Sequence, residues 1–139
     1  MAQQQYIEFA IEEEPYAIHI QDIYEIIRLQ DITHIPNVTF YVEGVINLRG
    51  TIIPVINLRR FFGLEERAHS RATRIIVVHH QEGTVGIIVD RVNKVAKFKD
   101  IQAPPKHIGG IDSSYFVGIG LSDNGLVGIL KLDEILLYR

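Results

Sequence analysis

The sequence contains no cysteine, which excludes disulfides, thiolate metal sites and thiol nucleophiles at once. It also lacks a basic excess: 14 Lys and Arg stand against 17 Asp and Glu, for a formal net charge of -3. We therefore do not expect this protein to bind nucleic acid. No apolar run approaches the roughly 20 residues that span a bilayer, and the N-terminus has no signal-peptide pattern. We expect a soluble cytoplasmic protein without direct membrane insertion.

The known signatures of catalysis and metal binding are missing as well. The six histidines do not show the i, i+4 helical spacing of a metal site. His79 and His80 are consecutive on a predicted strand, so they face opposite ways. No serine lies in a G-x-S-x-G motif, and the glycines match neither a phosphate-binding loop nor a dinucleotide fingerprint. We therefore predict no catalytic residue, no cofactor and no metal.

The residues that are present favour strands. Of the 139 residues, 47% are hydrophobic, and isoleucine and valine, which are strand formers, dominate this set. Apolar runs and alternation predict strands at 5–12, 16–20, 25–29, 44–48, 51–58, 73–79, 84–90, 92–98, 115–121 and 126–132. A helix of one or two turns that begins near Ile20 is predicted to lead into the strand at 25–29, and further short helices are predicted at 58–62, ended by Gly63, and at 132–138. Loops are expected at 32–37, 64–72 and 100–114.

The middle of the chain, Val42 to Leu64, predicts a hairpin with Arg49-Gly50 at its turn. Pro54 cannot donate a ladder hydrogen bond, so the second strand has an open edge or a bulge there. An arginine beside a tight turn is either a solvated surface residue or a fixed fork for a carboxylate on a partner. The hairpin alone does not decide between these two readings.

A weak internal repeat predicts the domain organisation. The segment 16–27 resembles 85–96, and the central hairpin with its helix resembles 118–132. Chance similarity between β-rich segments is the alternative. The repeat predicts an all-β protein of two similar subdomains, each a small curled sheet or barrel of about five strands, sharing one hydrophobic interface. The expected boundaries are 16–66 and 73–139, with the N-terminal strand a candidate to cross over.

A small nucleic-acid-binding barrel is the alternative from another functional class. Lys94, Lys97 and Lys99 surround Phe98, and aromatic side chains can stack on bases in such barrels. Asp90 and Asp100 dilute this basic strip, so we expect no nucleic-acid partner.

Several segments, in order, resemble the CheW family of bacterial chemotaxis coupling proteins. The most specific is V-E-G-V-I-N-L-R-G-T-I-I-P-V-I-N-L-R-R-F-F-G, and the others are Y-A-I-H-I-Q-D-I-Y-E-I-I, T-R-I-I-V-V, V-G-I-I-V-D-R-V-N-K-V and G-L-V-G-I-L-K-L-D-E-I-L. The resemblance covers about Gln4 to Tyr138. Where Asn57 stands, the family more often has an acidic residue; both types cap helices.

The resemblance implies two intertwined SH3-like five-stranded barrels within one domain, 1–139, and no catalysis. It implies an adaptor that couples the cytoplasmic tip of chemoreceptors to the regulatory domain of the histidine kinase CheA, and that is recruited to membrane-associated receptor arrays. A coupler for a parallel kinase system, such as twitching or gliding motility, is the alternative within the same class.

The resemblance also implies which residues bind partners. For receptor and kinase binding these are Ile23, Glu25, Gly44, Arg49, Gly86, Val92 and Val95. Ile32, Thr73 and Arg74 are weaker candidates for the kinase face. For the apolar members, core packing is the competing role. Glu25 and Arg49 pair either with each other or with a partner.

Overall fold

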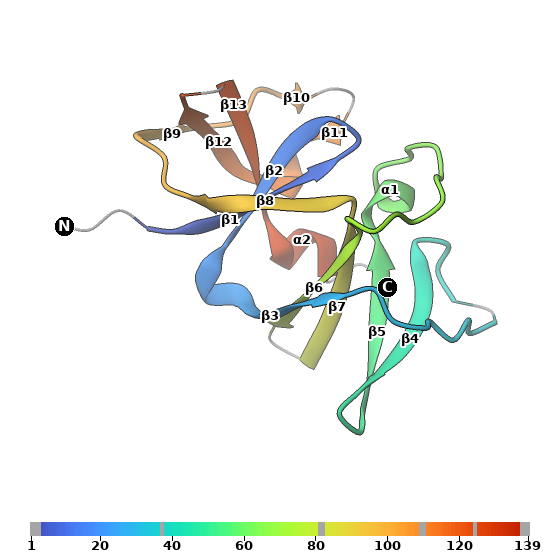
Figure 1. Cartoon of the computed structure of the whole chain (residues 1–139). Coiled ribbons are helices and arrows are strands. Elements are labelled where there is room, and N and C mark those ends of the chain that lie inside the picture. The colour runs from blue at the N-terminus through green and yellow to red at the C-terminus, as the bar shows by residue number, and fades with distance from the viewer. Residues whose placement is uncertain (1–3, 37, 81–82, 109–110, 124, 137–139) are drawn as a thin grey trace. The chain divides into compact units, whose positions relative to one another are not determined.

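The computed structural model describes residues 4–36, 38–80, 83–108, 111–123 and 125–136, and it is built almost entirely of strands (Figure 1). By contacts the chain forms two compact units. Unit 1 comprises Met1–Gln21 and Val92–Arg139, and unit 2 comprises the continuous segment Asp22–Arg91. This division differs from the expected boundaries at 16–66 and 73–139, because the chain passes from unit 1 into unit 2 after Gln21 and returns to unit 1 after Arg91.

Unit 2 contains a five-stranded sheet in the order β3-β6-β7-β5-β4. The bounds are β3 Ile23–Arg28, β4 Val42–Leu48, β5 Thr51–Asn57, β6 Arg74–His80 and β7 Gly83–Val89. The hairpin β4–β5 pairs antiparallel, and β5 joins β7 in parallel from Val55 to Asn57. Pro54 thus precedes the parallel ladder. Helix α1, Leu58–Phe61, follows β5, and Gly63 takes the positive φ that ends it.

Unit 1 contains a six-stranded sheet in the order β8-β1-β2-β13-β12-β9. The bounds are β1 Tyr6–Ile11, β2 Glu14–His19, β8 Arg91–Ala96, β9 Asp100–Gln102, β12 Phe116–Ser122 and β13 Gly125–Leu130. Helix α2, Leu132–Leu136, follows β13, and a separate pair consists of β10 His107–Ile108 and β11 Ile111–Asp112. The expected turn residue Asn124 and the end of the predicted last helix lie outside the described residues.

The sheet topology confirms the internal repeat. In unit 2 the antiparallel pair β6–β7 is joined in parallel by β5 of a hairpin that a short helix follows. In unit 1 the antiparallel pair β1–β2 is joined in parallel by β13, also from a hairpin followed by a short helix. The repeated segments 16–27 and 85–96 therefore occupy equivalent places, β2 with β3 and β7 with β8.

Two local predictions are wrong in part. The predicted helix of one or two turns is a single 3-10 turn at Ile20–Asp22, and the strand that it leads into, β3, begins at Ile23, two residues earlier than predicted. The β-branched residues there gain more from pairing with β6 than from the helical spacing of their side chains. The predicted loop at 100–114 contains β9, which pairs with β12. Its three residues are all exposed, so they carry no alternation that a sequence reading could detect.

Each unit has its own apolar core, and β-branched side chains supply most of the core of unit 2. That core consists of Ile46, Leu48, Ile53, Val55, Ile75, Val77 and Ile88, with Ile27, Leu29 and Ile32 packed against it. The unit 1 core consists of Tyr6, Ala17, Ala96, Phe98, Val127 and Ile129. Burying each large side chain contributes about 1.5–3 kcal/mol, so these clusters hold the sheets that position the surface residues.

Candidate functional site

The tip of the β4–β5 hairpin is the site that the sequence singles out, and its backbone is unusual. Arg49 has φ 51° and Gly50 has φ 88°, so both turn residues adopt the left-handed conformation. This pairing is typical of a type I′ hairpin turn, where a side chain other than Gly, Asn or Asp carries a conformational cost. The Asn47 side-chain oxygen accepts a hydrogen bond from the Gly50 N–H at 2.8 Å. The turn is thereby fixed with Arg49 at its apex.

Arg49 reaches across to β3 and forms a two-pronged ion pair with Glu25. Nη2 contacts Oε1 of Glu25, and Nη1 lies 3.4 Å from Oε2. The hydrogen bond to Glu25 and the charge of Glu25 raise the pKa of Arg49 above its ordinary value, and a hydrogen bond that the guanidinium donates to the Tyr24 hydroxyl oxygen adds to this effect. The Arg49 side chain is still 61% exposed. Arg49 and Glu25 therefore pair with each other while the guanidinium stays accessible.

This ion pair joins the two edges of the unit 2 sheet, since β3 and β4 are its outermost strands. A bridge between Thr33 and Val45 also links the segment after β3 to β4 through hydrogen bonds of 2.9 Å in both directions. Closing a sheet on itself satisfies its edge strands. Arg49 and Glu25 consequently lie at the seam of a small barrel.

The surface around the seam combines an arginine with exposed aromatic and apolar side chains. Tyr24, beside Glu25, is 56% exposed, and its ring packs edge-on against His79 at 4.4 Å between centroids. Ile52, opposite Asn47 in the hairpin, is also exposed. Tyrosine and arginine are enriched among residues that dominate binding energy at protein interfaces. The resemblance did not mark Tyr24; only its place next to Glu25 in the sequence could have indicated it.

Two of the predicted contact residues are buried glycines. A Cβ on Gly44 would overlap the carbonyl oxygen of Thr33 and lie 2.9 Å from Cγ2 of Ile32. A Cβ on Gly86 would lie 2.8 Å from Cγ2 of Ile75, inside the sheet. Both glycines allow close packing, and neither presents a side chain to solvent. These two glycines would affect partner binding only by setting where the neighbouring residues lie.

The remaining predicted residues are spread over both units. Ile23 is half-buried at the start of β3, while Val92 is half-buried and Val95 is 52% exposed on β8 in unit 1. Ile32 packs partly against the unit 2 core next to Gly44. Thr73 is buried, and Arg74 is half-buried at the start of β6. Within unit 2 the structure therefore brings together Glu25 with Arg49, and Ile32 with Gly44.

The basic strip of Lys94, Lys97 and Lys99, which begins on β8, lacks the exposed aromatic side chain that a nucleic-acid site would use. Phe98 is 5% exposed and belongs to the unit 1 core. Lys99 lies 3.5 Å from the carboxylate of Asp123 at the β12–β13 turn. Both side chains of this pair are largely exposed.

The described residues contain no group of three or more His, Asp or Glu side chains placed to hold a metal ion. Nor do they contain a helix long and apolar enough to cross a membrane. A basic cleft lies near the start of β6.

Small β-sheet units that carry an accessible, pre-formed ion pair on the surface are typical of a protein-binding module. The CheW-like domain family matches residues 5–138, and the chain belongs to this family. The chemotaxis protein CheW of Helicobacter pylori is 38% identical over 134 residues, covering 95% of this chain and 81% of that protein. The crystal structure of the scaffolding protein TtCheW from Thermoanaerobacter tengcongensis superposes with a TM-score of 0.87 at 36% identity, covering 95% of this chain and 86% of that one.

The protein PilI of Pseudomonas aeruginosa is 34% identical over 71 residues, which is 51% of this chain and 40% of that protein. The predicted family and all-β SH3-like fold class are thus confirmed.

Proposed function

We propose that this chain is a non-enzymatic adaptor that couples the cytoplasmic tip of chemoreceptors to the regulatory domain of the histidine kinase CheA. It acts in the cytoplasm and is recruited to receptor arrays at the membrane. Simultaneous binding provides the mechanism: a partner whose conformation alters its affinity for the adaptor biases the state of the other partner by the same free energy. Whole-length similarity to chemotaxis scaffold proteins supports this proposal.

The observation that carries the proposal is the paired but accessible Arg49 on a fixed turn. A side chain already held in place loses little conformational entropy when a partner binds. Glu25 fixes the guanidinium, and Tyr24 offers an adjacent aromatic ring. We assign Ile23, Glu25 and Arg49 to direct partner contact, together with Val92 and Val95 on unit 1. Gly44 and Gly86 act by positioning, and Ile32, Thr73 and Arg74 are assigned to the kinase face.

The test uses receptor-containing vesicles reconstituted with CheA and the full-length chain, with ATP-dependent kinase phosphorylation as the readout. Arg49→Glu is expected to abolish receptor control of the kinase while leaving the circular dichroism spectrum unchanged. Lys106→Glu, an equal charge change at an exposed residue of unit 1, is the matched control and is expected to behave like the wild type. Receptor control that survives Arg49→Glu intact would contradict the assignment.

A charge swap separates the two roles of Arg49. The double variant Glu25→Arg, Arg49→Glu restores an ion pair within the chain but reverses its orientation. If the pair only holds the barrel seam, the double variant regains receptor control. If Arg49 itself contacts a partner, the double variant stays inactive although its seam is restored.

A coupler for a parallel kinase system is the second candidate, favoured by the partial match to PilI. The same vesicles distinguish the two, because a chemotaxis adaptor supports control by chemoreceptors. Binding that is confined to the receptors and kinase of another system would favour the second candidate.

A further inference from the structure

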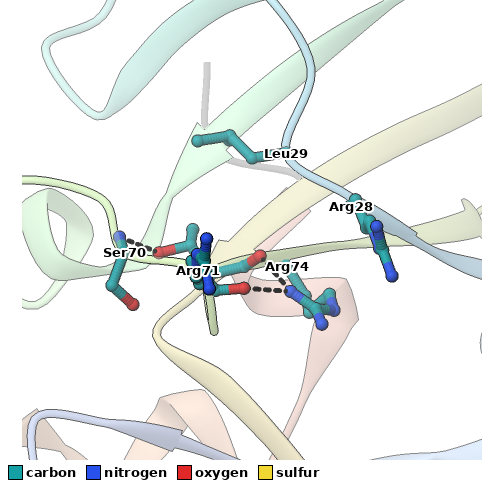
Figure 2. A pocket seen from close by; sticks show the side chains of 6 residues that line it. Arg28, Leu29, Ser70, Arg71 and Arg74 are labelled. Atoms are coloured by element: carbon teal, nitrogen blue, oxygen red, sulfur yellow. Dashed lines mark hydrogen bonds between the residues drawn. The ribbon is translucent and has the colours of Figure 1, made fainter.

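Three arginines surround a cleft of about 490 Å3 in unit 2, where β3 ends and β6 begins (Figure 2). The lining residues are Arg28, Leu29, Ser70, Arg71, Thr73 and Arg74. Arg28 and Arg71 are exposed, whereas Arg74 is half-buried. The chain as a whole carries a net charge of -3, so this concentration of positive charge is a local feature.

The three guanidinium groups have no acidic partner among the described residues. Other arginines of unit 2 do have one: Arg49 pairs with Glu25, Arg59 with Asp90 and Arg60 with Glu66. None of the six residues that line the cleft is acidic. The planar fork of arginine suits a carboxylate, and no carboxylate of the described residues takes that place here.

The register of the sheet makes the arrangement costly. Arg28 and Arg74 are directly opposite each other in the antiparallel pair β3–β6. Like charges at opposite positions destabilise a sheet. An anion in the cleft would turn this repulsion into attraction to a common ligand.

The turn before β6 holds Arg71 and Arg74 in place. The Ser70 N–H donates to Oγ1 of Thr73 at 2.9 Å, and the Ala72 N–H donates to Oγ of Ser70 at 3.1 Å. Nη1 of Arg74 donates to the backbone carbonyls of Arg71 at 2.7 Å and Thr73 at 2.9 Å, as Figure 2 shows. These bonds occupy one nitrogen of Arg74 and leave its other N–H groups to a ligand. The Arg74 guanidinium is therefore fixed before anything binds, and the backbone that carries Arg71 is held by the same turn.

A second basic cleft, of about 320 Å3, provides the contrast within the same chain. Lys94, Lys97 and Lys99 line it, but so does Asp123, which lies 3.5 Å from the Lys99 amine. This cleft supplies its own counter-charge. It also uses lysines, which are point charges without the two-pronged geometry of arginine.

We propose that the arginine cleft of unit 2 binds an acidic segment of a protein partner, with two or more carboxylates accepted by Arg28, Arg71 and Arg74. The volume exceeds that of one small anion and suits a few side chains. Half-buried Leu29 offers an apolar wall that a peptide side chain can cover. A long nucleic acid is disfavoured by the acidic net charge of the chain. The site extends the roles given above to Thr73 and Arg74, and it does not depend on which protein supplies the segment.

The test is a nuclear magnetic resonance titration of the 15N-labelled full-length chain with an acetylated peptide of sequence E-L-E-E. The Nε–Hε signals of Arg28, Arg71 and Arg74 are expected to shift saturably. A Q-L-Q-Q peptide is expected to leave them in place. Arg71→Glu should weaken the affinity by about tenfold or more, because it removes charge-assisted hydrogen bonds. Arg71→Lys, which keeps the charge but loses the fork, should fall in between.

Lys94→Glu is the matched control, since it makes the same charge change in the compensated cleft, and it is expected to leave the affinity unchanged. An equal loss in Lys94→Glu and Arg71→Glu would overturn the site in favour of overall charge. Tighter binding of inorganic phosphate or of a single-stranded oligonucleotide at the same signals would overturn the ligand class, and the lack of any saturable shift would overturn the proposal. The vesicle assay of Arg49→Glu tests the coupling function independently of this peptide titration.

Discussion

Replacing Gly44 by alanine tests whether this glycine contacts a partner or positions its neighbours. The new Cβ would overlap the carbonyl oxygen of Thr33 and lie 2.8 Å from its carbon, closer than real Cβ contacts come. The carbonyl must therefore move away. It accepts the Val45 N–H at 2.9 Å, and the Thr33 N–H donates to Val45 at the same distance, so both bonds of the bridge are lost.

The expected loss of stability follows from these contacts. Two backbone hydrogen bonds contribute about 1 kcal/mol each, and displacing Ile32 from its packing adds roughly another 1 kcal/mol. The total of about 3 kcal/mol lowers the melting temperature of a chain this size by roughly 10 °C. Thermal unfolding followed by circular dichroism measures this shift, and amide exchange at Val45 should become fast. Gly63→Ala is the control, because Gly63 also has positive φ but faces open space, and its cost is about 1 kcal/mol.

The reasoning would be refuted by a Gly44→Ala protein that melts like the wild type but no longer binds receptor or kinase. In that case the glycine would be a true contact residue, as the family resemblance implies. Loss of binding together with loss of stability supports the positioning role instead.

Two further predictions concern buried polar groups. Burial, aided by the nearby charge of Glu14, raises the pKa of Tyr16 above its ordinary 10.0, so the folded state holds this proton more tightly than the unfolded state. The stability that this proton contributes is complete below pH 10 and is lost above it. Tyr16→Phe should therefore reduce the fall in unfolding free energy, measured by urea titration, between neutral and strongly alkaline pH. An unchanged dependence of the unfolding free energy on pH would count against this. Asn57 donates to the buried carboxylate of Glu43 at 2.9 Å while its oxygen caps α1, so Asn57→Asp keeps the cap but opposes two carboxylates. We expect a loss of about 2 kcal/mol at neutral pH in the same titration, smaller in acid; equal stability of the two proteins would show that Glu43 does not need a donor there.

Local patterns in the sequence predicted the elements that local chemistry determines. The β4–β5 hairpin, the cap and end of α1 and the internal repeat follow from turn residues, a capping side chain and periodic apolar positions. The same patterns could not predict β9, since a short exposed edge strand has no apolar face. For the segment after Ile20 the apolar spacing indicated a helix of up to two turns before the strand, and pairing with β6 limits it to a single 3-10 turn.

The candidate sites were likewise predicted only as far as local sequence allows. The sequence marked Arg49 and Glu25 but left open whether they pair, because 24 residues separate them and only barrel closure brings them together. The arginine cleft was not predicted at all beyond Thr73 and Arg74. Its members come from the end of β3 and the turn before β6, and only the register that places Arg28 opposite Arg74 reveals the cluster.

Unit 1 is built from both ends of the chain, and this sets an order of events during synthesis. Unit 2 is one continuous segment and is free to fold as soon as Arg91 has emerged, whereas β2 pairs with β13, more than a hundred residues later. At ordinary translation rates the first hairpin, β1–β2, waits on the order of ten seconds for that partner, and a lone hairpin is only marginally stable in water. Both chain ends then enter the same unit. A tag or a truncation at either terminus therefore acts on unit 1, and the arginine cleft and the Arg49 seam belong to the half of the chain that both leave intact.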